Sequence, residues 1–238
     1  MIVPLFLLSF CVLLLLYIPV PWGIGYILRI RQKQKAVRNN QIYLTFDDGP
    51  GNRLTPHILS ILNENDIKAT FFLLGRNVAG REAVLRSIDY EGHCIASHSY
   101  SHFHSWKVLP WKSVFDIKQG LKSINDVLSQ AGRNYAYRPP CGKLNIFSLV
   151  YLCLKKIPVV FWSIDCLDTW PKDLRNVKFA AQKIRENKGG IVLFHDFDRT
   201  TETVDEYVLD SLKAAIIAGK DLGLEFSTID RLIEKGKE

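Results

Sequence analysis

Short apolar runs recur along the chain from about residue 40, and segments with helical periodicity lie between them. An apolar run of about four to eight residues indicates a buried strand. The intervening segments carry apolar side chains three and four positions apart, as at Ile117, Leu121 and Ile124, which is typical of helices that pack on one face. This alternation predicts parallel βα units in an α/β fold. The predicted strands are Ile42–Phe46, Ala69–Leu74, Cys94–His98, Tyr135–Arg138, Val159–Asp165, Ile191–His195 and Leu224–Thr228.

The amino-terminal segment has a different pattern. No charged side chain occurs between Ile2 and Leu28, and a membrane span needs about 20 such residues. Pro19 and Pro21 would kink or end a helix in this segment. We therefore predict a single transmembrane helix within residues 1–28. A cleavable signal peptide fits less well, because no Lys or Arg precedes the apolar run and no Ala-x-Ala site follows it; a buried helix of a soluble domain is the third interpretation.

The positive charge is concentrated next to this segment. The formal net charge is +7, and a cluster of basic residues begins at Arg29. We interpret residues 29–40 as a juxtamembrane linker and residues 41–238 as the catalytic domain. The cluster favours a cytoplasmic domain. No basic helix with interleaved aromatic residues recurs later, so no nucleic-acid partner is predicted. The five cysteines are scattered and odd in number, which predicts no disulfide framework.

Two adjacent carboxylates, Asp47 and Asp48, follow the first predicted strand, and Gly49-Pro50 then turns the chain. Adjacent carboxylates near a core repel each other and lose hydration. A bound cation, or one proton held between them, would offset that cost. Taken alone, a solvated acidic turn is the simpler interpretation.

Residues further along the chain change that interpretation. In parallel sheets, function gathers where the strands end. His98 and His102 are four residues apart, so on one helical turn they would share a face and could bind one metal ion. With Asp48 they form a set of two imidazoles and one carboxylate. Zinc is the first candidate for this set, which also suits other divalent ions.

Hydrolysis at such a metal also needs a base and an acid. Asp47 is the candidate base, and His195 is the candidate acid if Asp165 or Asp168 keeps it protonated. Arg138 could pair with Asp47 and orient it. Each residue singly also fits a structural role, as a core histidine or a salt-bridged arginine does.

The same residues resemble the motifs of a known family, the polysaccharide deacetylases, which are the NodB-homology family of carbohydrate esterases. The resemblance covers about residues 40 to 230. It implies a distorted (β/α) barrel of about seven parallel strands and the metal-dependent removal of an N-linked acetyl group from an N-acetylated amino sugar. The five matching segments, in order, are Thr45–Pro50, His98–His102, Arg138–Pro140, Asp165–Trp170 and Leu193–His195.

The resemblance also implies roles for single residues. Cys141 stands where the family often has an aromatic residue, at a position whose backbone N–H binds the oxyanion; its thiol as an extra metal ligand is a second hypothesis. Thr169 replaces an aromatic residue that lines the sugar groove, and Trp170 follows one place later. By the resemblance Asp47 is the base, Asp48, His98 and His102 are the metal ligands, Arg138 positions the base, Asp168 tunes the acid His195, and Leu193 is a wall of the acetyl pocket.

The sequence therefore predicts a membrane-anchored, metal-dependent amide hydrolase that acts on an acetylated amino sugar of a glycan or glycolipid. Two alternatives stay open: a deformylase or deacetylase of a lipid-linked amino sugar, and a catalytically inactive carbohydrate-binding domain on a membrane tether. The basic flank favours a cytoplasmic domain, whereas the family resemblance favours an extracytoplasmic one.

Overall fold

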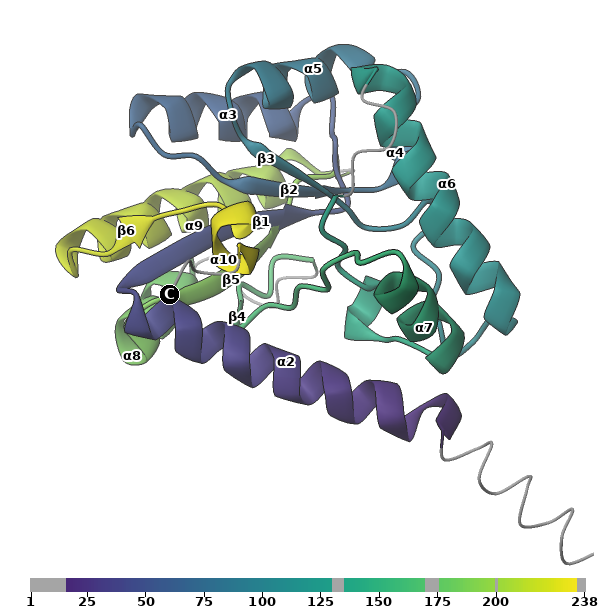
Figure 1. Ribbon diagram of the computed structural model, residues 1–238. Coiled ribbons are helices and arrows are strands. Elements are labelled where there is room, and N and C mark those ends of the chain that lie inside the picture. Colours follow the sequence, from purple (N-terminus) through teal and green to yellow (C-terminus); the bar gives the residue numbers. More distant parts are fainter. Residues whose placement is uncertain (1–15, 130–134, 170–175, 200, 235–238) are drawn as a thin grey trace, which may run out of the picture.

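Strand β1 (Gln41–Asp47) lies at the centre of the sheet in the computed structural model, which describes residues 16–129, 135–169, 176–199 and 201–234 (Figure 1). The strand order is β3-β2-β1-β5-β4, and β6 also pairs with β1. Every pairing is parallel, as the alternation of strands and helices predicts. The other strands are β2 (Thr70–Leu73), β3 (Cys94–Ser97), β4 (Ile164–Asp165), β5 (Gly190–His195) and β6 (Glu225–Phe226).

Isolated bridges, rather than full strands, close the ring between β3 and β4. Tyr137 pairs with Ser97 on one side and with Val159 on the other, and the chain after Val159 continues into β4. Prolines restrict pairing here, because Pro139 and Pro158 have no N–H to donate. The prediction of about seven full strands was therefore too regular, since the sheet of the described residues has six.

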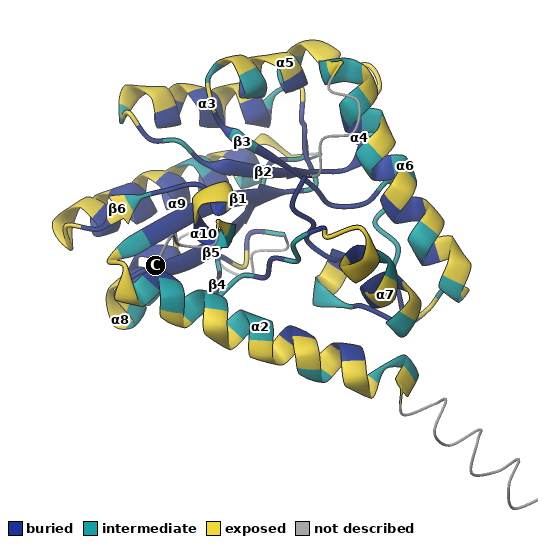
Figure 2. Cartoon of the chain, viewed as in Figure 1, coloured by how far each residue is buried: buried dark blue, intermediate teal, exposed yellow. Residues whose placement is uncertain are grey.

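Helices cover the outside of the sheet, and Figure 2 shows buried strands beneath helices whose outer faces are exposed. Three stacked rings mark the centre of the core: Phe46 lies 4.9 Å from Phe71 and 5.7 Å from Phe194, measured between centroids. The helices after β1 are α3 (Leu54–Glu64), α4 (Gly75–Val78), α5 (Glu82–Tyr90), α6 (Pro110–Leu128), α7 (Ile146–Leu154), α8 (Phe179–Asn187), α9 (Glu202–Asp221) and α10 (Ile229–Ile233).

The amino-terminal segment is where the sequence prediction fails. Helix α2 (Pro19–Arg38) lies along the barrel and packs against β5, β1 and α7 (Figure 1). Pro19 and Pro21 stand in its first turn, where a missing N–H costs nothing. Among the residues that the structure describes, no helix is both long and apolar enough to cross a membrane. The predicted transmembrane helix and single-pass anchor are therefore wrong for the described part of this segment, because residues 19–28 belong to α2 on the barrel. Residues 1–15 of that prediction lie outside the described residues.

The basic residues predicted to form a linker belong to α2 as far as Arg38, and several bind the barrel. Lys35 Nζ donates to the carbonyl of Leu232 over 2.6 Å. Gln32 pairs with the backbone at the weak seam of the barrel: its Nε2 donates to Val159 O (2.7 Å), and its Oε1 accepts from Phe161 N (2.9 Å). The Gln32 amide thus takes the place of a neighbouring strand where the sheet has only a single bridge.

Candidate active site

The candidate residues lie together because the strands are parallel. Asp47 ends β1 and His195 ends β5, and the two are register partners. His98 directly follows β3, which is separated from β5 by the two strands β2 and β1. Carboxyl ends of parallel strands meet at one edge, so side chains far apart in sequence converge there.

The best-defined group at this edge consists of Asp48, His98 and His102. Asp48 Oδ1 lies 3.6 Å from His98 Nε2 and 3.5 Å from His102 Nε2. The Oδ1 atom is buried and has no hydrogen-bond partner among the described residues. Ligand atoms held about 2.1 Å from a tetrahedral cation are themselves about 3.4 Å apart. The distances between the three side chains therefore match ligands of one divalent cation better than hydrogen bonds between the side chains.

The backbone holds Asp48 in this position. Its φ of 70° lies in the left-handed region, which disfavours residues with a Cβ. The side-chain amide of Asn77 donates to Asp48 O over 2.6 Å and supports that conformation. Asn77 gave no signal in the sequence analysis, because only the folded chain brings α4 against the turn.

His98 is oriented as a metal ligand requires. Its Nδ1 lies 2.8 Å from the carbonyl of Arg138, and a proton there leaves the Nε2 lone pair facing Asp48. Burial lowers the pKa of His98 to about 3, although the nearby Asp48 carboxylate raises it. The imidazole is thus neutral at physiological pH, which is the form that binds metals.

His98 and His102 do not share a helical turn, contrary to the prediction from their spacing. They lie on a loop in which His102 has a φ of 61°, and their ring centroids are 5.1 Å apart. Helix α6 holds this loop: Asp116 Oδ1 accepts from Ser101 N over 3.0 Å. Gly120 allows the close approach, since a Cβ there would lie 2.4 Å from the backbone of the loop.

Asp47 is fixed by a buried ion pair. Its Oδ1 lies 2.7 Å from Arg138 Nη1, which also donates to Thr45 Oγ1 over 2.8 Å. The guanidinium carbon lies 3.9 Å from the centroid of the Phe72 ring. Burial raises the pKa of Asp47, while the charge of Arg138 lowers it. The second oxygen, Oδ2, faces the metal-ligand group, 3.7 Å from His98 Nε2.

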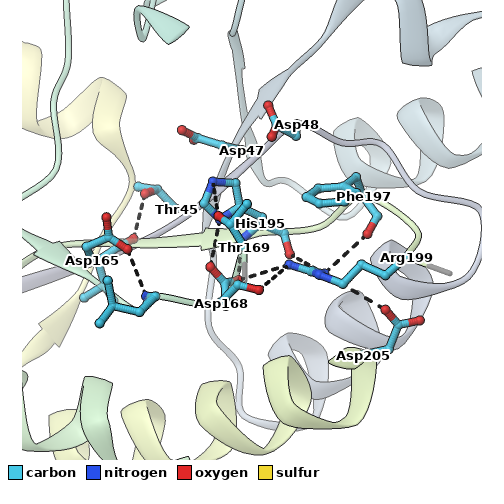
Figure 3. Close-up of polar contacts among 12 residues, drawn as sticks. Thr45, Asp47, Asp48, Asp165, Asp168, Thr169, His195, Phe197, Arg199 and Asp205 are labelled. Carbon is cyan, nitrogen blue, oxygen red and sulfur yellow. Dashed lines mark hydrogen bonds and ion pairs between the residues drawn. The ribbon is translucent and has the colours of Figure 1, made fainter. Parts of the chain in front are cut away.

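His195 lies between Asp168 and the Asp47–Asp48 pair (Figure 3). Its Nδ1 is 2.7 Å from Asp168 Oδ1, and its backbone N donates to Asp168 Oδ2 over 2.8 Å. Burial alone would lower the pKa of His195, but the charge and hydrogen bond of Asp168 outweigh it and raise the pKa to about 9. Asp165 does not take this role, because its Oδ1 accepts from Leu167 N instead.

Two residues that the sequence analysis did not single out also support the site. Arg199 Nη2 lies 3.5 Å from Asp168 Oδ2 and donates to Asp168 O over 3.1 Å (Figure 3). Asp196 is fully buried and accepts from Thr55 Oγ1 over 2.7 Å. Burial raises the pKa of Asp196 to about 7. Only the position of Asp196 at a strand end could have signalled it.

The predicted substrate-binding residues are placed differently. Leu193 is buried on β5 opposite Thr45. Cys141 is exposed, with a φ of 54°, and its sulfur is not part of the ligand group formed by the described residues, so nothing supports a thiol ligand. Trp170 lies outside the described residues. A cavity of about 310 Å³ adjoins the ligand group and is lined by Asp48, His102, Asn77, Arg76, Arg81 and Phe197, among others.

Comparisons with known proteins identify relatives of this chain. A sequence model of the family described as Polysaccharide deacetylase matches residues 34–151. The peptidoglycan-N-acetylglucosamine deacetylase PgdA of Listeria monocytogenes is 34% identical over 208 residues, which are 86% of this chain but 41% of that protein. The chain thus spans about two fifths of the length of the first relatives it matches.

Two further relatives cover more of their own length. The peptidoglycan-N-acetylglucosamine deacetylase of Bacillus cereus is 30% identical over 207 residues, 83% of this chain and 70% of that protein. The crystal structure of the Bc1960 peptidoglycan N-acetylglucosamine deacetylase is similar with a TM-score of 0.70 and 28% identity, and the match covers 86% of this chain and 96% of that one.

Proposed function

The chain belongs to the polysaccharide deacetylase family, as its five motifs predict, and from this premise we propose that it removes acetyl groups from N-acetylated amino sugars of a glycan. The names of the relatives point to peptidoglycan as the kind of glycan. We further propose that the reaction depends on a divalent cation, with zinc as the first candidate.

One observation carries this proposal: the buried, unpartnered Asp48 Oδ1 faces the Nε2 atoms of His98 and His102 at 3.6 and 3.5 Å. These three side chains would hold the cation. When bound, it supplies a Lewis acid that polarises the amide carbonyl and makes a coordinated water more acidic.

The remaining residues divide the proton transfers between them. Asp47, held by Arg138 over 2.7 Å, accepts a proton from the attacking water. His195, kept protonated by Asp168, donates a proton to the nitrogen that leaves as the C–N bond breaks. The products are acetate and the free amine of the sugar. The hydroxyl of the water adds to the acetyl carbon, Asp47 takes the remaining proton, and His195 supplies the proton that the amine nitrogen gains, so atoms and charges balance. The backbone N–H of Cys141 stays the predicted donor to the oxyanion.

The test separates turnover from metal binding. The full chain, loaded with zinc or cobalt, is incubated with N-acetylated oligosaccharides, and released acetate and bound metal are measured. We expect chelation to abolish acetate release and added metal to restore it. Asp47→Asn should keep the metal but lose at least about 100-fold in kcat, whereas Asp48→Asn and His98→Ala should lose the metal.

Retention of full acetate release by all three variants would refute the assigned roles. Absence of acetate from every substrate with the metal bound would favour the catalytically inactive carbohydrate-binding domain instead.

A further inference from the structure

A second cavity, of about 190 Å³, lies between α2 and the turn that follows Arg138-Pro139-Pro140. Its α2 wall precedes the segment that the family model matches, which starts at residue 34. The cavity therefore includes a wall that the family match does not cover. The side chains that matter here are Trp22, Tyr26, Arg29, Trp106, Cys141 and Lys143.

Aromatic rings form much of the lining. Trp22 and Tyr26 are each 58% exposed and stack with centroids 6.1 Å apart, one turn apart on α2. Trp106 lies across the cavity, fixed by a 2.8 Å hydrogen bond from its Nε1 to Leu144 O. Exposed, rigid ring faces with a few polar groups nearby are typical of small-ligand sites, and the apolar face of a pyranose ring is suited to stacking on them.

The same cavity is positively charged. Among the described residues, Arg29 and Lys143 line it and no acidic side chain does. Their cationic groups contact aromatic rings: the Arg29 guanidinium lies 4.7 Å from the Trp162 centroid, and Lys143 Nζ lies 4.4 Å from the Trp106 centroid. Gly142 lies next to Arg29 and has a φ of 65°, which favours glycine at this position. A guanidinium that contacts the face of a ring can still offer its N–H groups to a carboxylate.

The cavity is close to the proposed reaction centre. Cys141 lines it and is three residues after Arg138, whose carbonyl holds His98. Three residues span at most about 11 Å. Burial raises the pKa of the Cys141 thiol, and the negative charge of Asp48 raises it further, which agrees with this proximity. This upper limit on the distance between Arg138 and Cys141 is compatible with two neighbouring sugar residues of one glycan, one at the reaction centre and one in the cavity.

We infer that this cavity binds a carboxylate-bearing sugar of the same glycan, next to the sugar that loses its acetyl group. The ring of this sugar stacks on the aromatic lining, and its carboxylate pairs with Arg29 and Lys143. The inference rests on the proposed function and adds to it a binding site for an acidic sugar residue of the substrate.

The test compares two tetrasaccharides on the metal-loaded full chain. One is neutral, made of N-acetylglucosamine only; the other alternates N-acetylglucosamine with N-acetylmuramic acid, whose carboxylates are free. We expect wild type to show a higher kcat/KM for the acidic compound. Arg29→Gln should reduce the acidic-to-neutral ratio about tenfold, through KM, as expected for one charge-assisted pair. Lys143→Gln should act in the same direction.

The matched control is Arg31→Gln, an exposed arginine on the same helix that does not line the cavity. It should leave the ratio unchanged. Equal kcat/KM for both compounds in wild type, or an equal change for both in Arg29→Gln, would overturn the inference and leave the proposed function intact.

If neither compound releases acetate, the proposed function fails, and calorimetry decides on the cavity separately. Weaker binding of the acidic tetrasaccharide to Arg29→Gln than to wild type would support the cavity site, and equal binding would overturn it.

Discussion

The carboxylate of Asp168 controls the protonation of His195, and Asp168→Asn tests this control directly. The amide oxygen of asparagine can still accept the hydrogen bond from His195 N, which now spans 2.8 Å, so the ring should keep its place. The negative charge 2.7 Å from Nδ1 is removed, and the amide NH2 group takes the place of the oxygen that now faces Nδ1. Without that charge, burial dominates and the pKa of His195 falls from about 9 to its ordinary value or below.

The expected effect depends on pH, with a sign that follows from the raised pKa. A proton donor with a pKa of about 9 is mostly protonated at pH 8, whereas one at about 6.5 is only about 3% protonated there. The kcat of Asp168→Asn should therefore fall about thirtyfold at pH 8 and hardly change at pH 6 from this cause. In a full profile, the alkaline limb moves to lower pH by about 2.5 pH units or more.

The assay is acetate release from a neutral oligosaccharide between pH 5 and 10, with metal content and thermal unfolding measured alongside. Asp165→Asn is the control, because its carboxylate caps Leu167 N and does not contact His195. An alkaline limb that stays in place in Asp168→Asn, with metal bound and the fold intact, would refute the assignment of His195 as the acid.

Two other changes test how the site is built. Arg138→Met leaves Asp47 buried without its partner and should destabilise the fold by about 3–5 kcal/mol in chemical denaturation. Adding Asp47→Asn should recover much of the lost stability. A loss below about 1 kcal/mol in Arg138→Met alone would contradict a strong pairing. Gly49→Ala would place a Cβ 2.2 Å from Asp196 Oδ2 and should lower the stability of the fold by about 1–3 kcal/mol. Gly23→Ala is the control, because a Cβ there meets no atom within 4 Å and should not lower the stability. Equal melting temperatures for both variants would argue against the tight turn.

The sequence predicted those features that depend on local pattern. The apolar run Ile42–Phe46 became β1 with one more residue at each end, and Ile191–His195 became β5 with one more at its start. The rule that parallel strands end at one edge then sufficed to bring Asp48, His98 and His195 into one region. Resemblance to the family motifs added the individual roles.

What the sequence could not supply depends on contacts between distant segments. The choice of Asp168 over Asp165 follows from a turn at Leu167, whose φ is 57°. The loop of the two histidines takes its shape from Asp116 and Gly120 on α6, which carry no recognisable signal. The apolar composition before residue 29 indicated lipid, whereas Pro21 and Gly25 of the described part of this segment are buried against the barrel.

The pairing of Gln32 with Val159 and Phe161 has a consequence for where the folded domain begins. A fragment that started after α2 would leave a carbonyl and an amide at the barrel seam open to solvent and would uncover the Phe161 ring that Gly25 now touches. Such an exposed edge could pair with a second molecule and promote aggregation. The helix therefore completes the barrel wall at this seam, and shortened forms of this protein should retain it.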